Sequence, residues 1–331
     1  MKAQVIEKFG EPTVFELADI PKPTVIPGHV LIHVKATSVN PVDTKIRSGA
    51  VQAVAPEFPA VLHGDVAGVV VEVGEGVTAF QVGDEVYGCA GGFKGTGGAL
   101  AEYMLADAIL LDHKPKNLSM EEAAALPLVT ITAWEALYNR ARVQKGQTVL
   151  VHAAAGGVGH IAIQLAKLAG AKVYTTASSD EKIGIGIGFG VDVGINYKRQ
   201  SVAEYVAEYT GGKGFDVVFD TVGGENLDRS FEAAAIGGTV VGIAARSTHD
   251  LSPLHAKGLS LHITFMLLKI LNKEQRKDHN VILRQITKLV EEGKLRPLID
   301  PHPFTFDQVS DAHTLLETNQ AIGKVVLSNK W

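Results

Sequence analysis

Apolar positions follow two different patterns along the chain. Residues 1 to about 110 are rich in valine, glycine and proline, and the segment 29–39 alternates apolar and polar residues as a strand with one solvated face does. Helical periodicity is scarce in this part, which predicts an all-β, barrel-like domain. Helical structure is expected to begin after Ser119, a suitable N-cap residue with Glu122 at the capping-box position.

From residue 146 the pattern becomes strand, turn and helix, repeated. The apolar strand 148–153 is followed by a glycine-rich turn and by a helix over 156–170 that ends at a glycine. Such alternation predicts a parallel, doubly wound α/β sheet whose ligands bind at the carboxyl ends of the strands. A helical stretch is expected after residue 267. Further strands are expected at residues 171–177, 215–224, 237–244 and 260–265, and a last strand at 323–327 is expected to return to the first domain.

Composition narrows the class of protein. The 331 residues suffice for two domains, and 31 basic against 36 acidic residues, with no lysine- or arginine-rich block, argue against a nucleic-acid partner. The most apolar long run, 258–271, is too short to span a bilayer and is expected to be a buried strand that leads into a helix. The N-terminal segment lacks the apolar core of a signal peptide. Cys89 is the only cysteine, which excludes an internal disulfide and fits a reducing cytosol. We therefore expect a cytoplasmic protein without a membrane segment.

The turn 153–159, AAAGGVG, has the spacing of a dinucleotide-binding loop. Against the pattern GxGxxG, Ala154 replaces the first glycine, whereas Gly156 and Gly159 match. Gly156 lets the backbone approach a pyrophosphate, Gly159 lets the helix pack closely on the strand, and the helix N-terminus supplies free N–H groups. The alternative is a glycine turn that binds no ligand.

The end of the second strand indicates which dinucleotide is bound. Sites for NAD usually place an acidic residue about 20 positions after the last glycine. That place holds Ser178 or Ser179 in this chain, and Lys182 follows within reach of a 2′-phosphate, which favours NADPH. Asp180 complicates this interpretation, because a small loop shift could bring its carboxylate to the ribose. The downstream run 184–190 has four glycines but matches no phosphate loop, and we expect an irregular helix or loop without an assigned function.

These motifs together resemble the medium-chain dehydrogenase/reductase superfamily, and within it the quinone oxidoreductase branch. The resemblance covers essentially the whole chain and implies a GroES-like β-barrel catalytic domain over 1–122, a Rossmann domain over 123–267 and a return segment over 268–331 that completes the catalytic domain. It rests on SVNPVDTKIRSG (38–49), HGDVAGVVVEVG (63–74), VGDEVYG (82–88), LPLVTITAW (126–134), AAAGGVG (153–159), INY (195–197) and FDTVGG (219–224).

The resemblance also bears on metal binding. Zinc-dependent relatives have a ligand cysteine where this chain has Asn40, and their ligand histidine aligns with Gly64, so that His63 lies one position too early. The third ligand would fall near Leu128, which is apolar. Because a catalytic zinc needs three protein ligands, we expect no metal. His63 is expected to be a hydrogen-bonded loop histidine.

Site residues follow from the same resemblance. It implies that Asn40 and Thr130 lie near the nicotinamide as the catalytic pair, with Asn40 donating an amide hydrogen bond to the substrate. Two departures stand out: Val51 replaces a tyrosine found near the substrate in relatives, and Asn319 replaces an arginine at the 2′-phosphate, for which Lys324 is either a substitute or a surface lysine. The implied cofactor contacts are Ala154, Gly156, Gly157, Val158 and Gly159 at the pyrophosphate, Ser178, Lys182 and Tyr197 at the 2′-phosphate, and Val222, Ile243, Phe265 and Met266 at the nicotinamide.

The expected activity is metal-free, NADPH-dependent transfer of hydride to quinones or α,β-unsaturated carbonyls. Two alternatives remain: a 2-enoyl thioester reductase, and a non-catalytic NADPH-binding protein. A zinc alcohol dehydrogenase is the least favoured interpretation. Because the apolar strand 260–265 is expected at the edge of the sheet, and relatives pair there, we also expect a homodimer.

Overall fold

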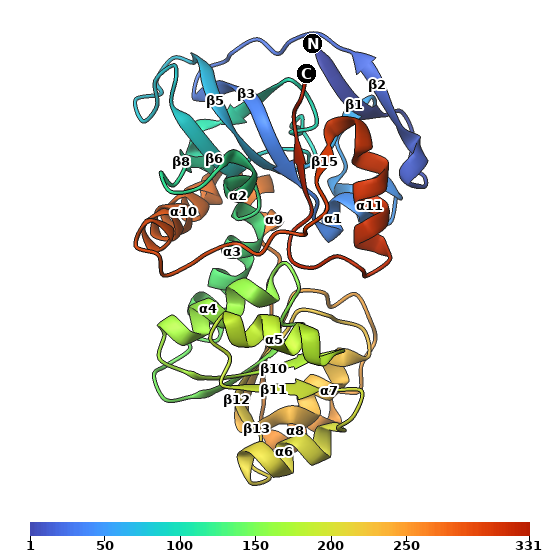
Figure 1. Cartoon of the computed structure of the whole chain (residues 1–331), viewed down its shortest axis with the longest axis vertical. Coiled ribbons are helices and arrows are strands. Elements are labelled where there is room, and N and C mark those ends of the chain that lie inside the picture. The colour runs from blue at the N-terminus through green and yellow to red at the C-terminus, as the bar shows by residue number, and fades with distance from the viewer. The chain divides into compact units, whose positions relative to one another are not determined.

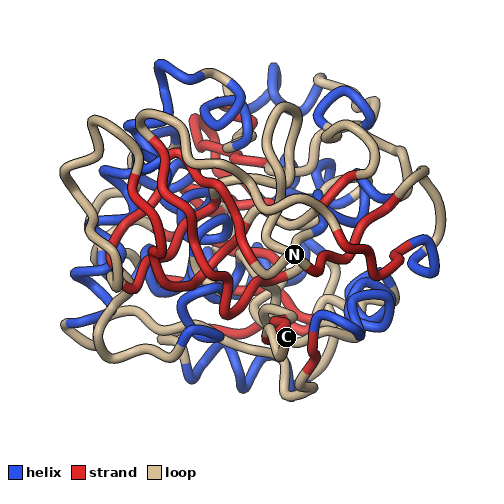
Figure 2. The backbone as a smooth tube through the Cα atoms, turned by 90° about the horizontal axis from the view of Figure 1, so that it is seen from above, coloured by secondary structure: helices blue, strands red, loops and turns tan.

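The computed structural model describes all 331 residues, which form two compact units (Figure 1). The first unit contains Met1–Leu128 and Leu267–Trp331, and the second contains Val129–Met266. The chain therefore passes into the second unit after residue 128, six residues later than the expected boundary at 122. Both termini belong to the first unit and lie side by side in both views (Figures 1 and 2).

The first unit is built on β-sheets. A seven-stranded sheet has the order β15-β16-β3-β5-β6-β8, with β7 paired to β3, and a smaller sheet has the order β2-β1-β4. The strands are β1 (Lys2–Ile6), β2 (Phe15–Asp19), β3 (His29–Ser38), β4 (Ala60–Val61), β5 (Asp65–Val73), β6 (Glu85–Cys89), β7 (Tyr103–Asp107), β8 (Leu111–His113), β15 (Phe304–Thr305) and β16 (Val326–Ser328). The helices of this unit are α1 (Pro41–Arg47), α2 (Met120–Ala124), α9 (Leu267–Leu271), α10 (Arg276–Glu291) and α11 (Val309–Glu317).

Strand pairing brings distant segments of the first unit together. In the antiparallel registers of β3, Ser38 is opposite both Asp65 of β5 and Val326 of β16. The expected return strand at 323–327 is thereby confirmed, although it begins slightly later. The capping box of α2 is also confirmed, because Ser119 Oγ accepts the Glu122 N–H at 3.1 Å and the Glu122 carboxylate accepts the Ser119 N–H at 2.8 Å.

The second unit is a parallel sheet with the order β11-β10-β9-β12-β13-β14. The order reverses between β9 and β12, so the loop after β9 lies at a topological switch point, where such sheets bind ligands. The strands are β9 (Thr148–His152), β10 (Lys172–Ala177), β11 (Val193–Asn196), β12 (Phe215–Asp220), β13 (Ala234–Gly242) and β14 (Ser260–Ile263). The helices are α4 (Gly159–Leu168), α5 (Asp180–Gly188), α6 (Val202–Thr210), α7 (Asn226–Ala233) and α8 (Ser252–Lys257). Helix α3 (Pro127–Trp134) begins in the first unit and continues in the second into a π-helical turn at Glu135–Arg140.

Two local expectations need correction or refinement. The strand expected to be buried at 260–265 is the edge strand β14, and Ile263 is 44% exposed because β14 has only one neighbour, β13. The glycine-rich run 184–190 is not a loop: the regular helix α5 extends through Gly188. None of the helices is both long and apolar enough to cross a bilayer.

Candidate active site

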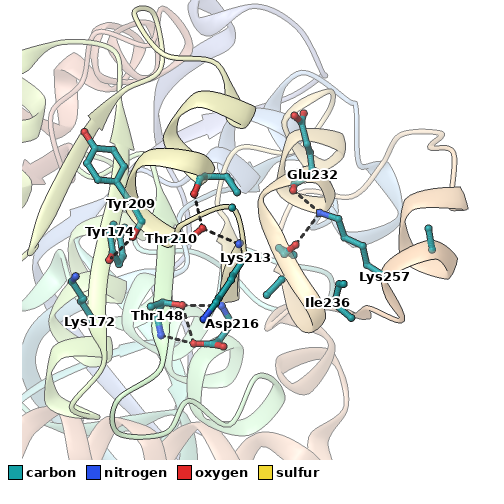
Figure 3. A pocket seen from close by; sticks show the side chains of 16 residues that line it. Thr148, Lys172, Tyr174, Tyr209, Thr210, Lys213, Asp216, Glu232, Ile236 and Lys257 are labelled. Atoms are coloured by element: carbon teal, nitrogen blue, oxygen red, sulfur yellow. Dashed lines mark hydrogen bonds between the residues drawn. The ribbon is translucent and has the colours of Figure 1, made fainter.

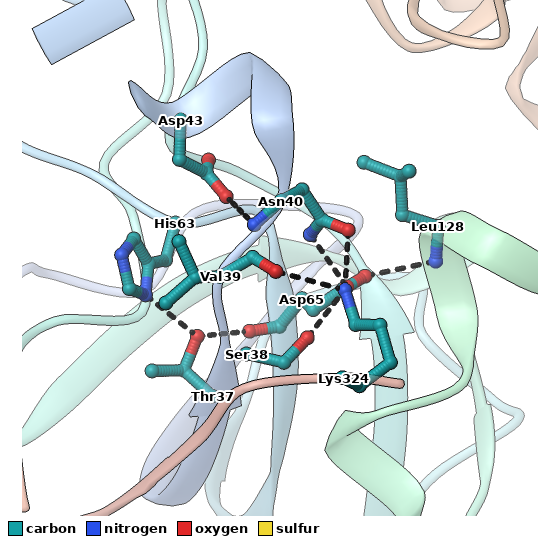
Figure 4. Close-up of polar contacts among 9 residues, drawn as sticks. All are labelled: Thr37, Ser38, Val39, Asn40, Asp43, His63, Asp65, Leu128 and Lys324. Carbon is teal, nitrogen blue, oxygen red and sulfur yellow. Dashed lines mark hydrogen bonds and ion pairs between the residues drawn. The ribbon is translucent and has the colours of Figure 1, made fainter. Parts of the chain in front are cut away.

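Asn40 lies two residues after the end of β3, where it is the N-cap residue of α1. Its Nδ2 donates to Asp65 Oδ2 at 2.8 Å, and its Oδ1 accepts from Lys324 Nζ (Figure 4). Lys324 Nζ also donates to the Val39 carbonyl at 3.0 Å and lies 3.5 Å from Asp65 Oδ2. The strand register of β3 with β5 and β16 therefore assembles a buried Asn40–Asp65–Lys324 cluster.

The two charged partners determine the orientation of the Asn40 amide. An ammonium group can only donate and a carboxylate can only accept, so Oδ1 must face Lys324 and Nδ2 must face Asp65. Asp65 accepts two further hydrogen bonds, from Ser38 Oγ and from the Leu128 N–H, each at 2.9 Å. The amide cannot flip without placing like groups against each other.

Lys324 is neither a surface lysine nor free to bind a phosphate. Its side chain is 3% exposed, and its three donor hydrogens face the Val39 carbonyl, Asn40 and Asp65. Burial lowers the pKa of the Lys324 ammonium, while the Asp65 and Asp43 carboxylates oppose that shift. The expectation of an exposed or phosphate-binding lysine is wrong because β16 returns this residue to the inside of the first unit.

A second carboxyl group lies beside the cluster. Asp43 Oδ2 accepts the backbone N–H of Asn40 at 2.7 Å, whereas Oδ1 has no hydrogen-bond partner. Burial raises the pKa of Asp43 to about 7, against the opposing effect of the Asn40 N–H. This carboxyl group therefore titrates near neutral pH inside the first unit.

His63 is fully buried and hydrogen-bonded, with a left-handed backbone φ of 72°. The Thr37 hydroxyl donates to the Asp65 carbonyl at 2.6 Å, so at 3.4 Å from His63 Nδ1 it can only accept the imidazole proton. His63 Nε2 is then unprotonated and accepts from His313 Nε2 at 2.9 Å. Burial lowers the pKa of His63 to about 3, which keeps the imidazole neutral.

The positions that hold zinc in relatives do not fit a metal. The Asn40 amide is engaged at both ends, and Leu128 offers no donor side chain. A Cβ atom added to Gly64 would come within 2.7 Å of the Phe93 ring, so this position has no room for a ligand side chain. No group of three or more His, Cys, Asp or Glu side chains in the chain could hold a metal ion. The absence of a functional metal stays a prediction to be tested by metal analysis.

In the second unit, the loop 153–159 joins β9 to α4 in the expected place. The backbone N–H groups of Gly157, Val158 and Gly159 donate to no protein acceptor. A Cβ atom on Gly159 would lie 2.0 Å from the Ala153 carbonyl oxygen, so only glycine permits this close approach of helix and loop. Free N–H groups at the N-terminus of a helix are the donors that bind a pyrophosphate. The loop therefore fits a dinucleotide.

The groups expected at a 2′-phosphate lie at the carboxyl ends of β10 and β11. Ala177 is opposite Asn196 in the parallel register, so Ser178 and Tyr197 follow at the same edge. Ser179 caps α5 by accepting the Lys182 N–H at 3.3 Å, which leaves Ser178 as the residue in the place of the acid.

The Asp180 carboxylate is engaged by two neighbouring side chains. It accepts from Arg199 Nη1 at 2.9 Å and from Asn196 Nδ2 at 3.2 Å. Arg199 is a cation beside this edge that sequence reasoning missed; its position two residues after Tyr197 was the available signal. Both charged groups are largely exposed.

The remaining predicted residues divide between the carboxyl edge of the sheet and the helix α3. Asp220 Oδ1 accepts the N–H groups of Val222 and Gly223 at 2.8 Å each, which shapes the loop after β12. Ile243 follows β13 and donates its N–H to the Asp220 carbonyl at 3.2 Å. Phe265 and the buried Met266 follow β14, whereas Thr130 lies buried in α3.

The opposite edge of the same sheet carries a cavity of about 920 Å³ (Figure 3). Its lining includes Thr148, Lys172 and Asp216, at the amino ends of their strands. Lys257 Nζ donates to three carbonyl oxygens, those of Phe231, Glu232 and Ala234. Asp216 is likewise paired within the protein, through Thr148. The loop after β9 lies at the topological switch point on the carboxyl edge, so the candidate site is at that edge.

A GroES-like sheet unit with a doubly wound dinucleotide-binding unit defines a class of nucleotide-dependent oxidoreductases. Comparison with family models matches residues 26–116 to the alcohol dehydrogenase GroES-like domain and residues 189–327 to zinc-binding dehydrogenases. The chain belongs to the medium-chain dehydrogenase/reductase superfamily, in the quinone oxidoreductase branch.

Among its relatives are proteins of plants, animals and bacteria. The chain is 36% identical to the chloroplastic NADPH-dependent alkenal/one oxidoreductase of Arabidopsis thaliana, over 99% of this chain and 79% of the relative. It is 32% identical to the quinone oxidoreductase of Homo sapiens, over 99% and 97% of the two chains. The crystal structure of Escherichia coli quinone oxidoreductase complexed with NADPH superimposes with a TM-score of 0.89 at 27% identity, covering 99% and 100%.

Proposed function

We propose that this protein is a metal-free, NADPH-dependent reductase of quinones or α,β-unsaturated carbonyls. Two features of this chain carry the proposal. One is the phosphate loop with free N–H groups at Gly157, Val158 and Gly159. The other is the Asn40–Asp65–Lys324 cluster, in which Asn40 occupies the position of the ligand cysteine of zinc-dependent relatives. The relatives' activities support the same class of substrate.

NADPH, when bound, supplies the hydride. The chain's own contribution begins with the loop N–H groups, which would donate hydrogen bonds to the pyrophosphate. Lys182 and Tyr197 receive the 2′-phosphate beside Ser178, where an NAD-binding protein would place an acid. Asp180 is neutralised by Arg199, so that it does not repel this phosphate. Val222, Ile243, Phe265 and Met266 are proposed to line the nicotinamide side.

A site without zinc has no Lewis acid to polarise a carbonyl oxygen. The acceptor must therefore already be electron-poor, as a quinone or an enone is. The reduced quinone oxygen delocalises its charge and takes a proton from water, so no side-chain acid is obligatory, in keeping with Val51 where relatives have tyrosine. An enolate is more basic and gains more from a positioned donor. Quinones should therefore be the faster substrates.

Asn40 and Thr130 are proposed as the catalytic pair near the nicotinamide. Nδ2 of Asn40 uses one hydrogen on Asp65, and the second hydrogen is proposed to stabilise the developing oxyanion. Asn40 is 0% exposed, so this role requires that substrate binding open the packing around the amide. A residue that served only as the N-cap of α1 would instead affect stability without affecting turnover.

Steady-state kinetics with NADPH and NADH against quinones, alkenals and enoyl thioesters tests the proposal. We expect NADPH to be oxidised fastest with ortho- or para-quinones. Enoyl thioesters as the best acceptors would establish the enoyl reductase alternative. If the purified protein binds NADPH but none of the tested acceptors supports its oxidation, the non-catalytic alternative holds and the proposed activity is refuted.

We further propose a cytoplasmic homodimer. The edge strand β14 exposes its unpaired side and Ile263, which suits pairing with a second copy. Cys89 is fully buried, and burial raises the pKa of its thiol, so it is an unreactive structural residue suited to a reducing compartment. Light scattering of the wild type and of Ile263→Lys tests the assembly: a dimer that the substitution dissociates is expected, and a monomeric wild type would refute it.

A further inference from the structure

Helix α5 is weak by composition. Three of its nine residues, Gly184, Gly186 and Gly188, are glycine. An exposed glycine inside a helix lowers the helix equilibrium about fivefold relative to alanine, which is ~1 kcal/mol at 25 °C. This helix is capped by Ser179 and carries Lys182 in its first turn, so it bears the groups proposed to bind the 2′-phosphate.

The packing of α5 compensates for this weakness only in part. Its one fully buried residue, Gly186, has no side chain to bury, Ile183 and Ile185 are half-buried, and Ile187 is exposed. In α4, by contrast, eight residues from Gly159 to Ala166 are buried. A helix with few buried apolar contacts belongs to the low-stability part of a structure.

The three glycines have different surroundings. A Cβ atom at Gly186 would lie 3.0 Å from the Ala154 Cβ and 3.4 Å from Thr175 Cγ2, so packing against the phosphate loop explains this glycine. Around Gly184 and Gly188 there is no atom within 4 Å of such a Cβ, and neither residue has a positive φ. Nothing in the folded structure requires glycine at these two positions.

We propose that the 2′-phosphate of NADPH stabilises α5, and that Gly184 and Gly188, by weakening this helix, set how strongly NADPH is preferred over NADH. The inference rests on the proposed placement of the 2′-phosphate at Ser178 and Lys182. A phosphate there pairs with Lys182 and interacts favourably with the helix N-terminus, so binding and helix formation reinforce each other. NADH has no 2′-phosphate and gains nothing from a formed α5.

The test is Gly184→Ala, with the dissociation constants of NADPH and NADH measured by fluorescence titration. We expect the Kd of NADPH to fall by about three- to fivefold, where fivefold is the full effect on the helix equilibrium of replacing one glycine by alanine. The Kd of NADH should stay within about 1.5-fold of the wild-type value. Hydrogen exchange provides the second measurement. The amides of residues 182–188 should exchange rapidly in the free protein, and NADPH should slow them more than saturating NADH does.

Two variants serve as controls. Gly97→Ala changes an exposed glycine of the first unit that also has no atom near its added Cβ and no positive φ, and it should change neither Kd. Gly186→Ala should weaken the binding of both nucleotides, because its methyl group meets Ala154 of the phosphate loop. Adding Ala154→Gly to Gly186→Ala removes that contact and should recover most of the loss.

Three results would overturn the inference. Gly184→Ala could raise thermal stability without changing the Kd of NADPH, which would mean that α5 is already formed in the free protein. It could strengthen NADPH and NADH equally, or residues 182–188 could be protected from exchange before any nucleotide is added. In each of these cases NADPH still binds and the proposed function survives. A protein that binds neither nucleotide would refute both.

Discussion

Replacing Lys324 by methionine should destabilise the first unit strongly. Methionine keeps the length of the side chain but removes the ammonium group, which leaves the buried Asp65 carboxylate without its cation. The Val39 carbonyl and Asn40 Oδ1 lose their donor as well. Removing one partner of a buried ion pair typically costs about 3–5 kcal/mol, most of it from the charge left behind.

The contacts around Asp65 set the expected size of the effect. Ser38 Oγ, Asn40 Nδ2 and the Leu128 N–H still donate to the carboxylate in the variant, at 2.8–2.9 Å. These three donors lower the cost of the unpaired charge, whereas the two orphaned carbonyl groups add to the cost. We therefore expect Lys324→Met to lower the free energy of unfolding of the first unit by about 3–4 kcal/mol.

Urea unfolding can be followed separately in this unit. The chain has two tryptophans, and Trp134 lies in the second unit while Trp331 lies in the first, packed edge-on against Phe306. In a Trp134→Phe background, the fluorescence of Trp331 reports on the first unit alone. The variant should have a lower midpoint with an unchanged m value.

Lys22→Met is the matched control. Lys22 lies 3.0 Å from Glu72 in the same unit, but the two side chains are 43% and 50% exposed, so losing this ion pair should cost less than about 1 kcal/mol. If Lys324→Met were no more destabilising than Lys22→Met, the buried cluster would contribute nothing to folding, and the reasoning from burial would be wrong.

Four further predictions concern the site. Asn40→Ala should lower kcat with a quinone by about tenfold or more and leave the Kd of NADPH nearly unchanged. Lower thermal stability with a normal kcat would instead show that Asn40 serves only as the N-cap of α1. Lys182→Glu should raise the KM for NADPH by about 5- to 150-fold, as a pair worth ~1–3 kcal/mol implies, with little change for NADH; equal wild-type affinity for both nucleotides would contradict this. Because burial raises the pKa of Asp43 from 3.8 to about 7, its contribution to stability is fully present below pH 3.8 and is lost as pH rises through 7. The unfolding free energy of the wild type relative to Asp43→Asn should thus fall by about 2 kcal/mol between pH 5 and pH 7 in urea titrations, and a constant difference would refute it. Mass spectrometry should find no stoichiometric zinc, and activity should survive chelation; turnover abolished by chelators would require a metal.

The parts of this protein that were predictable from sequence depend on neighbours close in the chain. A strand, a glycine turn and a helix within about 20 residues identify the phosphate loop, and the Ser119–Glu122 capping box forms between residues three positions apart. Strand periodicity likewise predicted the parallel sheet, because alternation of strands and helices leaves few other packings. The resemblance to zinc-dependent relatives placed their ligand positions at Asn40, Gly64 and Leu128, and the side-chain chemistry of these three residues predicted that they would not bind zinc.

Contacts that join distant segments could only come from the tertiary structure. Lys324 lies 284 residues from Asn40, and His313 lies 250 residues from His63, so no local sequence pattern could predict either contact. As a lone lysine next to a strand, Lys324 is expected at the surface, whereas the pairing of β16 with β3 places it two residues before β16, buried beside the Asp65 carboxylate.

The same distinction applies to the glycine-rich helix. Local propensity argued against a regular helix over 184–190, since glycine weakens helices. The chain nevertheless forms α5 through Gly188, because Ser179 caps it and Gly186 allows close packing on Ala154. Sequence by itself thus determined the elements whose energies arise within a few residues. The tertiary structure decided the charge state of Asp43, the partners of Lys324 and the formation of α5, because desolvation and packing depend on which distant segments the fold brings together.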